Sequence, residues 1–514
     1  METFISKTFT SYNPKTGAVA ATYPVMNSEE VARAVDRMRH VHTVCAEPGF
    51  DMGGQKERRE RLIALRASIA ADTEVLAHTV STEIGKPMQE ALGADLLALI
   101  CALDWLIAHM PRLLAQQDVP GERNACLWPA PYGVVGIIGT WNYPLLLDGT
   151  TIAWALAAGN TVVWKPSELA TASALALYSH FQRAGLPVEL VLGDGITGSA
   201  LCAMPLDKLA FTGGVATGRK ILSQLAVRGT PSVMELSGND ALIVCTDADI
   251  EATARAAVWA RICNSGQSCV SPQRIYVVSS VYEPFVQLCR RFMKGLRAGV
   301  DYGPLRTDEL RRNAQSLVCN AEGQGARLLA GGHSLAASEF AGGYYYAPTL
   351  LVDTTDAMPI MQQDFFGPVL CVRAVSSEEE AITAANNNDM GLGASIWTKD
   401  VARGLQIAQR LRAGIVTVNT ETLMTGARPG LPFGGTGASG FGRQRGAAGL
   451  NEFLSWKTVC WQGKVGAQRH VFPYREATLP ILRGMIALKT AQGMRAKLQA
   501  GREMLDAARK WNQS

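Results

Sequence analysis

One cysteine of the chain follows a short polar turn. Residues 261–270 have the sequence RICNSGQSCV, which places Cys269 after an asparagine, two serines and a glycine. A thiol reacts as the thiolate, and a turn that offers backbone N–H groups with little apolar bulk is a setting in which the pKa of a thiol falls. The chain has eleven cysteines, and most free cysteines are buried and structural. The turn alone therefore does not identify a nucleophile.

Two polar side chains upstream favour a catalytic role for Cys269. Glu235 ends an apolar segment in the sequence MELSGN, and Asn142 lies in a kinked turn, GTWNYP. The carboxylate can act as a base and the amide as a hydrogen-bond donor to an oxyanion. Taken singly, Glu235 also fits a capping or ion-paired carboxylate, and Asn142 fits a turn residue that satisfies its own backbone.

Asn142, Glu235 and Cys269, in this order and in these local sequences, resemble the aldehyde dehydrogenase superfamily. The resemblance covers about residues 13–456. Further segments in the matching order are WKPSE (164–168), FTGG (211–214), FGPV (366–369), VN (418–419), and PFGG (432–435) followed by SGFGR (439–443). So many motifs in series over three hundred residues leave very little room for coincidence.

The resemblance implies an NAD(P)-dependent, non-acylating enzyme that oxidises an aldehyde to an acid. The Cys269 thiolate would add to the carbonyl group, and the Asn142 amide and the Cys269 backbone N–H would stabilise the oxyanion. Hydride transfer to the nicotinamide would leave a thioester, which Glu235 would hydrolyse by activating water. The branch that passes the acyl group to coenzyme A generally lacks a base at this position, so Glu235 favours a free acid as product.

Nine residues are expected to bind the cofactor: Trp141, Lys165, Ser167, Glu168, Gly213, Gly214, Gly218, Asp364 and Phe366. Lys165 and Glu168 follow an apolar strand, where open α/β sheets bind ligands. The resemblance implies that they bind the hydroxyl groups of the adenosine ribose. A glutamate there would repel a 2′-phosphate, which favours NAD and leaves NADP as the alternative. Gly213, Gly214 and Gly218 lie where a helix is expected to begin, and the backbone N–H groups of that helix end can face the pyrophosphate.

Three departures from the family pattern bear on the site. Asp364 stands where the family usually has glutamate, which predicts a looser contact to the nicotinamide ribose. Residues 237–240 are SGND where the family commonly shows two glycines and a lysine, and the sequence does not explain this change. Thr150 stands where members that act on small aldehydes often have a large aromatic residue.

The residues expected to form the substrate tunnel are Leu146, Thr150, Ser268 and Phe433. Together with Leu147 they predict a wide, apolar entrance for a long aliphatic, terpenoid or aromatic aldehyde. The alternative is a semialdehyde dehydrogenase with a charged substrate, which would require an arginine in the tunnel, and Arg428 is the candidate for it.

Composition excludes several other classes of protein. Of 514 residues, 47% are hydrophobic and 18% charged, and the net charge is +4, which is typical of a soluble globular protein and gives no indication of nucleic-acid binding. An odd number of scattered cysteines without CxxC pairs predicts a reducing, cytoplasmic compartment and no metal site. The apolar stretch 133–159 contains Gly, Asn, Pro and Asp, which predicts a buried strand, turn and helix instead of a membrane span.

Alternating apolar strands and helices predict an α/β fold with two doubly wound, mostly parallel open sheets. The predicted domains are an NAD-binding domain (1–236, with 120–131 as part of a bridging element), a catalytic domain (237–445), a bridging segment (446–467) and a tail (468–514). The resemblance implies a homodimer or homotetramer joined through the bridging segments.

The tail has a composition of its own. From Arg469 onward it has nine Lys and Arg against three acids, a net charge of +6, which leaves −2 for the remainder. Apolar residues recur at helical spacing and predict one or two amphipathic helices with basic polar faces. Such helices usually dock on their own protein or on a partner subunit. The alternative is reversible attachment to an anionic membrane surface.

Overall fold

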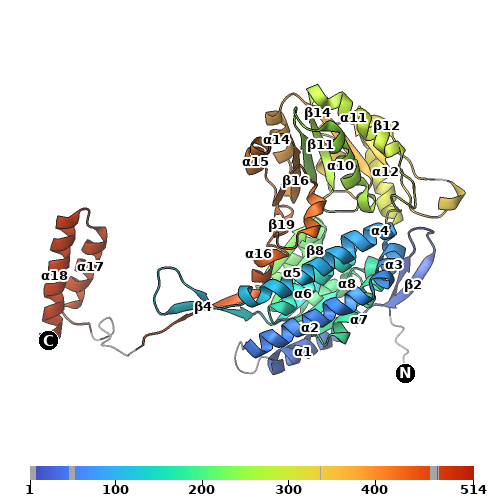
Figure 1. Ribbon diagram of the computed structural model, residues 1–514. Coiled ribbons are helices and arrows are strands. Elements are labelled where there is room, and N and C mark those ends of the chain that lie inside the picture. Colours follow the sequence, from blue (N-terminus) through green and yellow to red (C-terminus); the bar gives the residue numbers. More distant parts are fainter. Residues whose placement is uncertain (1–6, 46–51, 336, 464–471, 473, 514) are drawn as a thin grey trace, which may run out of the picture. The chain divides into compact units, whose positions relative to one another are not determined.

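The computed structural model describes residues 7–45, 52–335, 337–463, 472 and 474–513. The chain forms two compact units. The larger comprises residues 1–116 and 129–457, and the smaller comprises residues 117–128 and 458–514. The larger unit has two sheets with helices on their faces (Figure 1), which confirms the predicted α/β class.

The first sheet has six strands, in the order β19 (Gly440–Phe441), β9 (Ser232–Leu236), β8 (Lys208–Gly213), β5 (Val134–Ile138), β6 (Thr161–Lys165) and β7 (Val188–Leu190). All neighbours pair in parallel except β19, which is antiparallel to β9. The chain runs outward from β5 to β7 and then returns to β8 on the other side of β5. Ligands of open α/β sheets bind at such a switch point, beyond the carboxyl ends of the strands.

Helices cover both faces of this sheet because its central strands are apolar on both sides. Val135 and Ile137 of β5 pack into one core and Val134 and Ile138 into another, as the two-residue period of a strand requires. The first core is covered by α2 (Met52–Ala71), α3 (Thr73–Ile84), α5 (Ala98–Leu113), α6 (Pro144–Ala157) and α7 (Thr171–Arg183). The second is covered by α1 (Ser28–Cys45), α8 (Gly195–Ala203) and α9 (Val215–Leu225).

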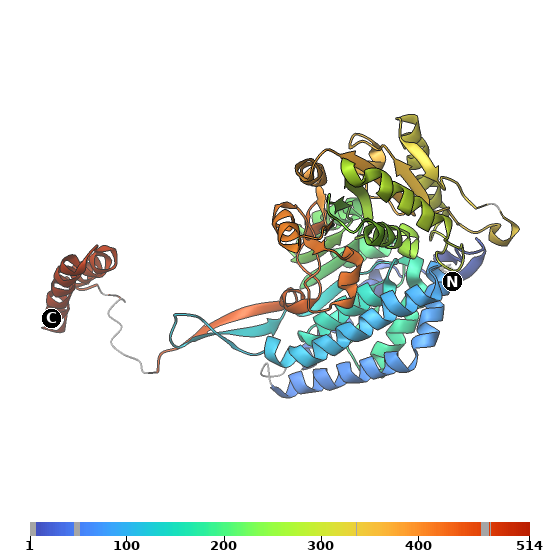
Figure 2. The same cartoon turned by 45° about the horizontal axis from the view of Figure 1, so that its top comes forward.

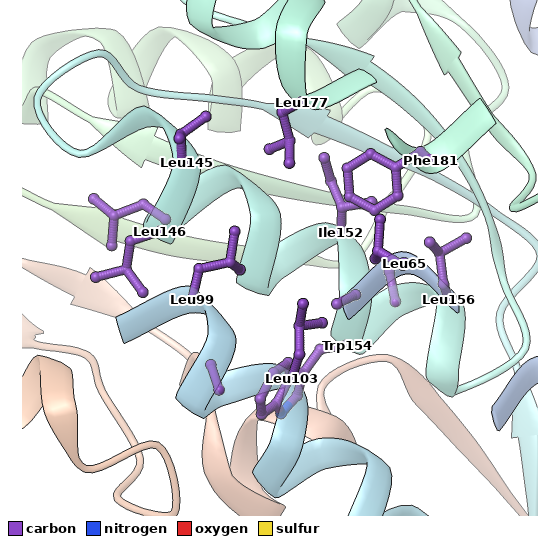
Figure 3. Close-up of a cluster of buried hydrophobic side chains, with 14 of the residues drawn as sticks. Leu65, Leu99, Leu103, Leu145, Leu146, Ile152, Trp154, Leu156, Leu177 and Phe181 are labelled. Atoms are coloured by element: carbon purple, nitrogen blue, oxygen red, sulfur yellow. The ribbon is translucent and has the colours of Figure 1, made fainter. Parts of the chain in front are cut away.

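Helix α6 lies at the centre of the first core. Every residue of α6 is buried, and its Leu145, Leu146 and Ile152 lie close to Leu99 of α5 and Leu177 of α7 (Figure 3). Because α6 begins directly after the turn that contains Asn142, this packing fixes the position of the turn.

A long apolar helix runs from Met88 to Leu113, formed by α4 (Met88–Glu90), the π-helical turn η1 (Ala91–Leu97) and α5. By length and composition it could cross a membrane, but half of its apolar 18-residue window is buried inside the protein, and α5 packs against α2 and α6. Its buried Asp95 accepts a hydrogen bond from Lys86, with Nζ and Oδ2 2.7 Å apart. These features are those of a core helix.

The second sheet has seven strands, in the order β12 (Arg327–Ala330), β13 (Thr349–Val352), β14 (Val369–Val375), β11 (Pro272–Val278), β10 (Asp240–Val244), β16 (Gly393–Trp397) and β17 (Ile415–Val418). The strands are parallel except for the pair β12–β13. Helices α10 (Ile250–Ile262) and α11 (Ser279–Lys294) cover one face. The other face packs against α12 (Asp308–Gly323), α13 (Pro359–Gln362), α14 (Glu378–Asn386) and α15 (Val401–Arg410).

Smaller elements complete the larger unit. Two short antiparallel pairs are β1 (Thr8–Tyr12) with β2 (Val19–Pro24), and β15 (Met390–Gly391) with β18 (Thr436–Gly437). The remaining short elements are the helix α16 (Gly446–Asn451) and the 3-10 turns η2 (Glu168–Ala170), η3 (Cys263–Gly266), η4 (Ser338–Phe340) and η5 (Thr422–Ala427). A third sheet, whose strand β3 belongs to the smaller unit, has the order β20 (Leu454–Cys460), β4 (Ala125–Pro131) and β3 (Gln117–Asp118).

The end of the chain forms a helical hairpin of α17 (Thr478–Thr490) and α18 (Met494–Gln513), which lie side by side (Figure 2). The predicted helices are therefore present. Small residues form the contact between them: Gly484, Ala500 and Ala507 are buried, and Gly484 lies against Met504.

Candidate active site

The turn that carries Cys269 has a constrained backbone. It follows α10 and contains three consecutive residues, Asn264, Ser265 and Gly266, with φ of 50°, 56° and 74°. Residues other than glycine rarely adopt this conformation, and it costs on the order of 1 kcal/mol or more for each. A Cβ on Gly266 would lie 2.0 Å from the carbonyl oxygen of Gly367, so only glycine fits there.

Hydrogen bonds from three directions hold this turn. The Asn264 backbone N–H donates to the buried Glu90 carboxylate at 2.8 Å, and the Asn264 amide donates to the carbonyl oxygen of Asn142 at 2.9 Å. The Ser265 hydroxyl donates to Gly303 O at 2.7 Å. Gln267 accepts the N–H of Arg306 at 2.8 Å. A strained turn persists when its surroundings determine it in this way, and the result is a fixed position for Cys269.

Glu235 and Cys269 line the same cavity, although Glu235 comes from strand β9 and Cys269 from the loop between η3 and β11. The Glu235 carboxyl at the end of β9 lies close enough to the Cys269 thiol and the Thr212 hydroxyl for both groups to lower its pKa. Burial raises the pKa of Glu235 to about 7, although the thiol, the positive charge of Arg445 and Thr212 act in the opposite direction. Burial and the neighbouring Glu235 raise the pKa of the Cys269 thiol well above its usual range. A carboxyl group with a pKa near neutrality is suited to general-base chemistry.

Asn142 lines the same cavity as the thiol. Its amide donates to the carbonyl oxygen of Gln267 at 3.1 Å, and its own side-chain oxygen accepts a bond from the Thr140 hydroxyl at 3.1 Å. One amide N–H therefore remains for a ligand. The backbone N–H of Cys269 donates to no group in the described part of the chain. These two donors match the pair expected for an oxyanion hole.

Cys269 separates two cavities. One, of about 220 Å³, is lined by all three predicted catalytic residues together with Trp141, Gly213, Gly214, Asp364 and Phe366. The structure thus brings five of the nine predicted cofactor residues around the thiol. The rings of Trp141 and Phe366 meet edge to face, with centroids 5.5 Å apart, and they form an aromatic wall.

The other four predicted cofactor residues do not line this cavity. Lys165, Ser167 and Glu168 lie at the carboxyl end of β6, and the Lys165 ammonium group pairs with the Glu168 carboxylate at 3.0 Å. The Ser167 hydroxyl accepts the N–H of Leu169 at 3.3 Å and caps η2. Gly218 lies in the first turn of α9 and packs against Leu236. All four occupy the carboxyl edge of the first sheet or the helix that begins there.

The second cavity, of about 370 Å³, is mostly apolar. Leu146, Ser268 and Phe433 of the predicted tunnel line it, together with Leu97, Leu147, Trp259, Val270, Leu423 and Met424. The prediction for Thr150 is wrong. Thr150 is buried and does not line the cavity, because its hydroxyl turns back onto its own helix and donates to the carbonyl oxygens of Leu146 and Leu147.

The comparisons with known proteins agree with this arrangement. The model of the aldehyde dehydrogenase family matches residues 3–459. The chain belongs to the aldehyde dehydrogenase family. Its fold is that of solved aldehyde dehydrogenases.

Three solved structures illustrate the similarity. A Mycobacterium tuberculosis aldehyde dehydrogenase complexed with NAD+ is 29% identical with a TM-score of 0.84, over 91% of this chain and 97% of that one. The NAD+ complex of a Bacillus cereus aldehyde dehydrogenase is 31% identical with a TM-score of 0.83, over 89% and 94%. PnpE from Pseudomonas sp. WBC-3 is 30% identical with a TM-score of 0.84, over 90% and 96%.

The structure shows the contacts of residues 237–240, where the sequence departs from the family pattern. Gly238 allows a close approach of the catalytic segment, since a Cβ there would lie 2.4 Å from the carbonyl oxygen of Cys269. The Asn239 amide donates to Met361 O at 3.0 Å. Asp240 accepts the N–H of Gly393 at 2.9 Å, and burial raises its pKa to about 8. These contacts fix the start of β10 against α13 and β16 of the second sheet.

Asp364 is held on the cofactor side of the site. Its carboxylate accepts a hydrogen bond from the Gln273 amide at 3.2 Å. Burial raises the pKa of Asp364, while Ser237 and Gln273 lower it.

Sequence reasoning missed two charged residues of the apolar cavity, Arg445 and Glu90. Arg428, which was the candidate for a tunnel arginine, is exposed and does not line the cavity. Arg445 lies two residues after the matched segment SGFGR and has a positive φ of 61°. Glu90 does not belong to any of the matched motifs. Burial raises its pKa to about 7.

Proposed function

We propose that this member of the aldehyde dehydrogenase family oxidises a long-chain, terpenoid or aromatic apolar aldehyde to the carboxylic acid with NAD as oxidant. The single observation that carries the substrate class is the apolar cavity that opens onto Cys269. Its volume of about 370 Å³ lies in the range of small-molecule sites, which bury most of their ligand against apolar walls.

The residues present fit NAD. Gly214 caps the amino end of α9 without a side-chain hydrogen bond, which leaves backbone N–H groups of that turn to receive a pyrophosphate. Trp141 and Phe366 would flank the nicotinamide end, and Lys165 with Glu168 would hold the adenosine ribose. The Glu168 carboxylate is unfavourable for a 2′-phosphate, so we propose NAD in preference to NADP. The bound cofactor supplies the hydride acceptor.

The protein's own residues carry the remaining steps. The Cys269 sulfur forms a bond to the aldehyde carbon, and the Asn142 amide and the Cys269 backbone N–H stabilise the negative charge on oxygen. After loss of the hydride the substrate is held as a thioester on Cys269. Glu235 then removes a proton from water, the hydroxide adds to the thioester carbon, and the C–S bond breaks to release the acid and restore the sulfur.

A panel of aldehydes tests the substrate class. NADH formation is measured with hexanal, decanal, benzaldehyde and succinic semialdehyde, with NAD and then with NADP. We expect the highest kcat/KM with decanal or benzaldehyde and with NAD. A preference for succinic semialdehyde would replace the proposal by a semialdehyde dehydrogenase, and a lack of NADH formation with every aldehyde would refute both.

We also propose that the α17–α18 hairpin binds an anionic membrane surface. Seven large apolar side chains of the hairpin are at least half exposed, while small residues fill the contact between its helices: Leu479, Leu482, Met485, Ile486, Met494, Leu498 and Leu505. Seven Lys and Arg against two acids from residue 478 onward complement an anionic headgroup layer. Such helices lie in the interface with their apolar face toward the acyl chains, where apolar aldehydes also accumulate.

Sedimentation with vesicles tests this placement. The full chain is compared with a chain that ends near Arg469 and with a Leu482→Glu, Leu498→Glu double variant, on phosphatidylserine-containing and on neutral vesicles. Salt-sensitive binding to the anionic vesicles, lost in both altered chains, is the expected result. Equal partitioning of all three proteins would refute membrane binding and favour docking of the hairpin on this protein or a second copy.

A homodimer or homotetramer joined through residues 120–131 and 446–467 is proposed on the family resemblance. Sedimentation equilibrium of the full chain measures it, and a monomer at micromolar concentration would refute it.

A further inference from the structure

The apolar cavity beside Cys269 contains one basic side chain among the described residues that line it, Arg445. The guanidinium group lies over the ring of Phe433, with Cζ 4.8 Å from the ring centroid. Its Nη1 donates to the carbonyl oxygens of Thr425 at 3.2 Å and Gly426 at 3.1 Å. The residue is 4% exposed. Backbone and ring contacts therefore fix a full positive charge at the wall of the cavity.

This charge lacks an ion-pair partner. Within the described ranges, no carboxylate lies within ion-pair distance of the guanidinium, and its buried Nε has no hydrogen-bond acceptor. A buried unpaired cation is costly, and leucine or another apolar residue would fill such a position without that cost. The backbone of Arg445 also has a positive φ, 61°, which adds strain. Such costs concentrate at functional sites.

The groups that interact electrostatically with Arg445 are the two reacting ones, Cys269 and Glu235. The interactions raise the pKa of Arg445, against burial, which lowers it to about 10. The other charged groups that face Cys269 are the acids Asp240 and Asp364, and both raise the pKa of the thiol. Asp364 also raises the pKa of Glu235. Arg445 lowers the pKa of Glu235, so its charge acts against the effect of the acids around the thiol.

We propose that Arg445 is the counter-charge of the reacting pair, a positioning residue that stabilises the ionised forms of Cys269 and Glu235. The inference rests on the proposed thiol chemistry. Ionisation of the thiol gives a thiolate and a proton that leaves to solvent, and the guanidinium keeps its own protons throughout. Opposite charges at short range lower the pKa of an acid by one or more units.

The competing role for Arg445 is to bind a carboxylate of the substrate. That role predicts an effect on one class of aldehydes and none on the free thiol. The counter-charge role predicts a change in the thiol itself before any aldehyde is present. The two are therefore separable in the enzyme without substrate.

The test is the pH dependence of Cys269 alkylation. The full-length protein is treated with iodoacetamide between pH 5.5 and 10 without aldehyde, and the modified Cys269 peptide is quantified by mass spectrometry. The variants are Arg445→Leu, Arg445→Gln and Arg445→Lys, and the matched control is Arg428→Leu, which removes an exposed arginine from a segment near the cavity. NAD binding and thermal unfolding are measured for each.

We expect the neutral variants to shift the alkylation curve by about one pH unit upward, a roughly tenfold slower reaction at a given pH on its rising part. Arg445→Lys and Arg428→Leu should lie near the wild-type curve. If Arg445→Leu does not fold, the Gln and Lys variants give the same comparison. A wild-type curve in the neutral variants, or loss of activity on succinic semialdehyde alone, would overturn the proposal. Failure of the thiol mechanism itself would appear separately, as full activity of a wild-type protein already alkylated at Cys269.

Discussion

Replacing Glu235 by glutamine should make the protein more stable and less active, and the gain in stability should depend on pH. Burial raises the pKa of Glu235 from 4.5 to about 7. Each pKa unit corresponds to about 1.4 kcal/mol, so the ionised carboxylate costs the folded state on the order of 3 kcal/mol. Because the folded state holds the proton more tightly than the unfolded state does, stability falls as the pH rises from about 4.5 to about 7 and stays low above that.

The neutral amide removes this cost above pH 7 and changes little below pH 5. With about 2 cal/mol/K of unfolding entropy per residue over the roughly 450 residues of the larger unit, the gain at pH 8 corresponds to about 3 °C in Tm. Differential scanning calorimetry at pH 5 and pH 8 measures it. Glu60→Gln, at an exposed position, is the control. Equal changes in Tm at both pH values, or a lower Tm of the variant at pH 8, would show that ionisation of the buried Glu235 carboxyl does not destabilise the folded protein.

The same variant should separate the two halves of the reaction. Thioester formation does not need the Glu235 carboxylate, so a burst of NADH equal to the number of subunits is expected. The steady state that follows should fall by about a hundredfold or more, because the base for hydrolysis is gone. In the wild-type protein the steady state should rise about tenfold between pH 6 and pH 8 as a base with a pKa of about 7 loses its proton. Normal turnover, or a variant without a burst, would refute this role.

Three further outcomes are expected. Cys269→Ala should abolish NADH formation and retain NAD binding, measured by fluorescence titration, since the residues around the cofactor come from other segments. Leu147→Trp places a larger side chain on the wall of the apolar cavity and should lower kcat/KM for decanal about tenfold more than for propanal. Unchanged kcat/KM values across the aldehyde chain lengths would show that α6 does not line the substrate tunnel. Gly266→Ala should lower activity and Tm together, because its Cβ would meet the Gly367 carbonyl oxygen; wild-type values would show that the turn relaxes freely.

The residues that could be predicted from the sequence are those that lie in short, distinctive motifs. Asn142 follows β5 and Glu235 lies at the end of β9, and ligands of an open sheet bind beyond the carboxyl ends of its strands. The position of the glycine-rich turn before α9 follows from the same rule. Cys269 and Phe366 lie before strands β11 and β14 of the other sheet, and for these two residues the local motif, and not the strand order, gave the prediction. Local sequence therefore predicted the inner part of the site well.

The wall of the cavity was less predictable because it depends on side-chain direction. Arg428 and Arg445 both lie in loops, and nothing in their spacing shows that one is exposed while the other lies over the ring of Phe433. Thr150 follows Leu146 by one helical turn, yet its hydroxyl returns to the α6 backbone. In the tail, helical periodicity predicted the helices, and only the packing shows that Gly484 and two alanines occupy the contact between them.

Burial has opposite consequences for the two reacting groups, and this gives a last prediction. It raises the pKa of Glu235 to a value that suits a base, and it raises the pKa of Cys269 away from a value that suits a nucleophile. The negative charge of Glu235 adds to the second effect, while Arg445 opposes it. Glu235→Gln should therefore move the alkylation curve of Cys269 to lower pH, and Arg445→Leu should move it to higher pH. The double variant should lie between the two single ones, because each loss offsets the other. Shifts in the same direction would mean that the charges of Glu235 and Arg445 do not act on the thiol, and that packing alone sets its reactivity.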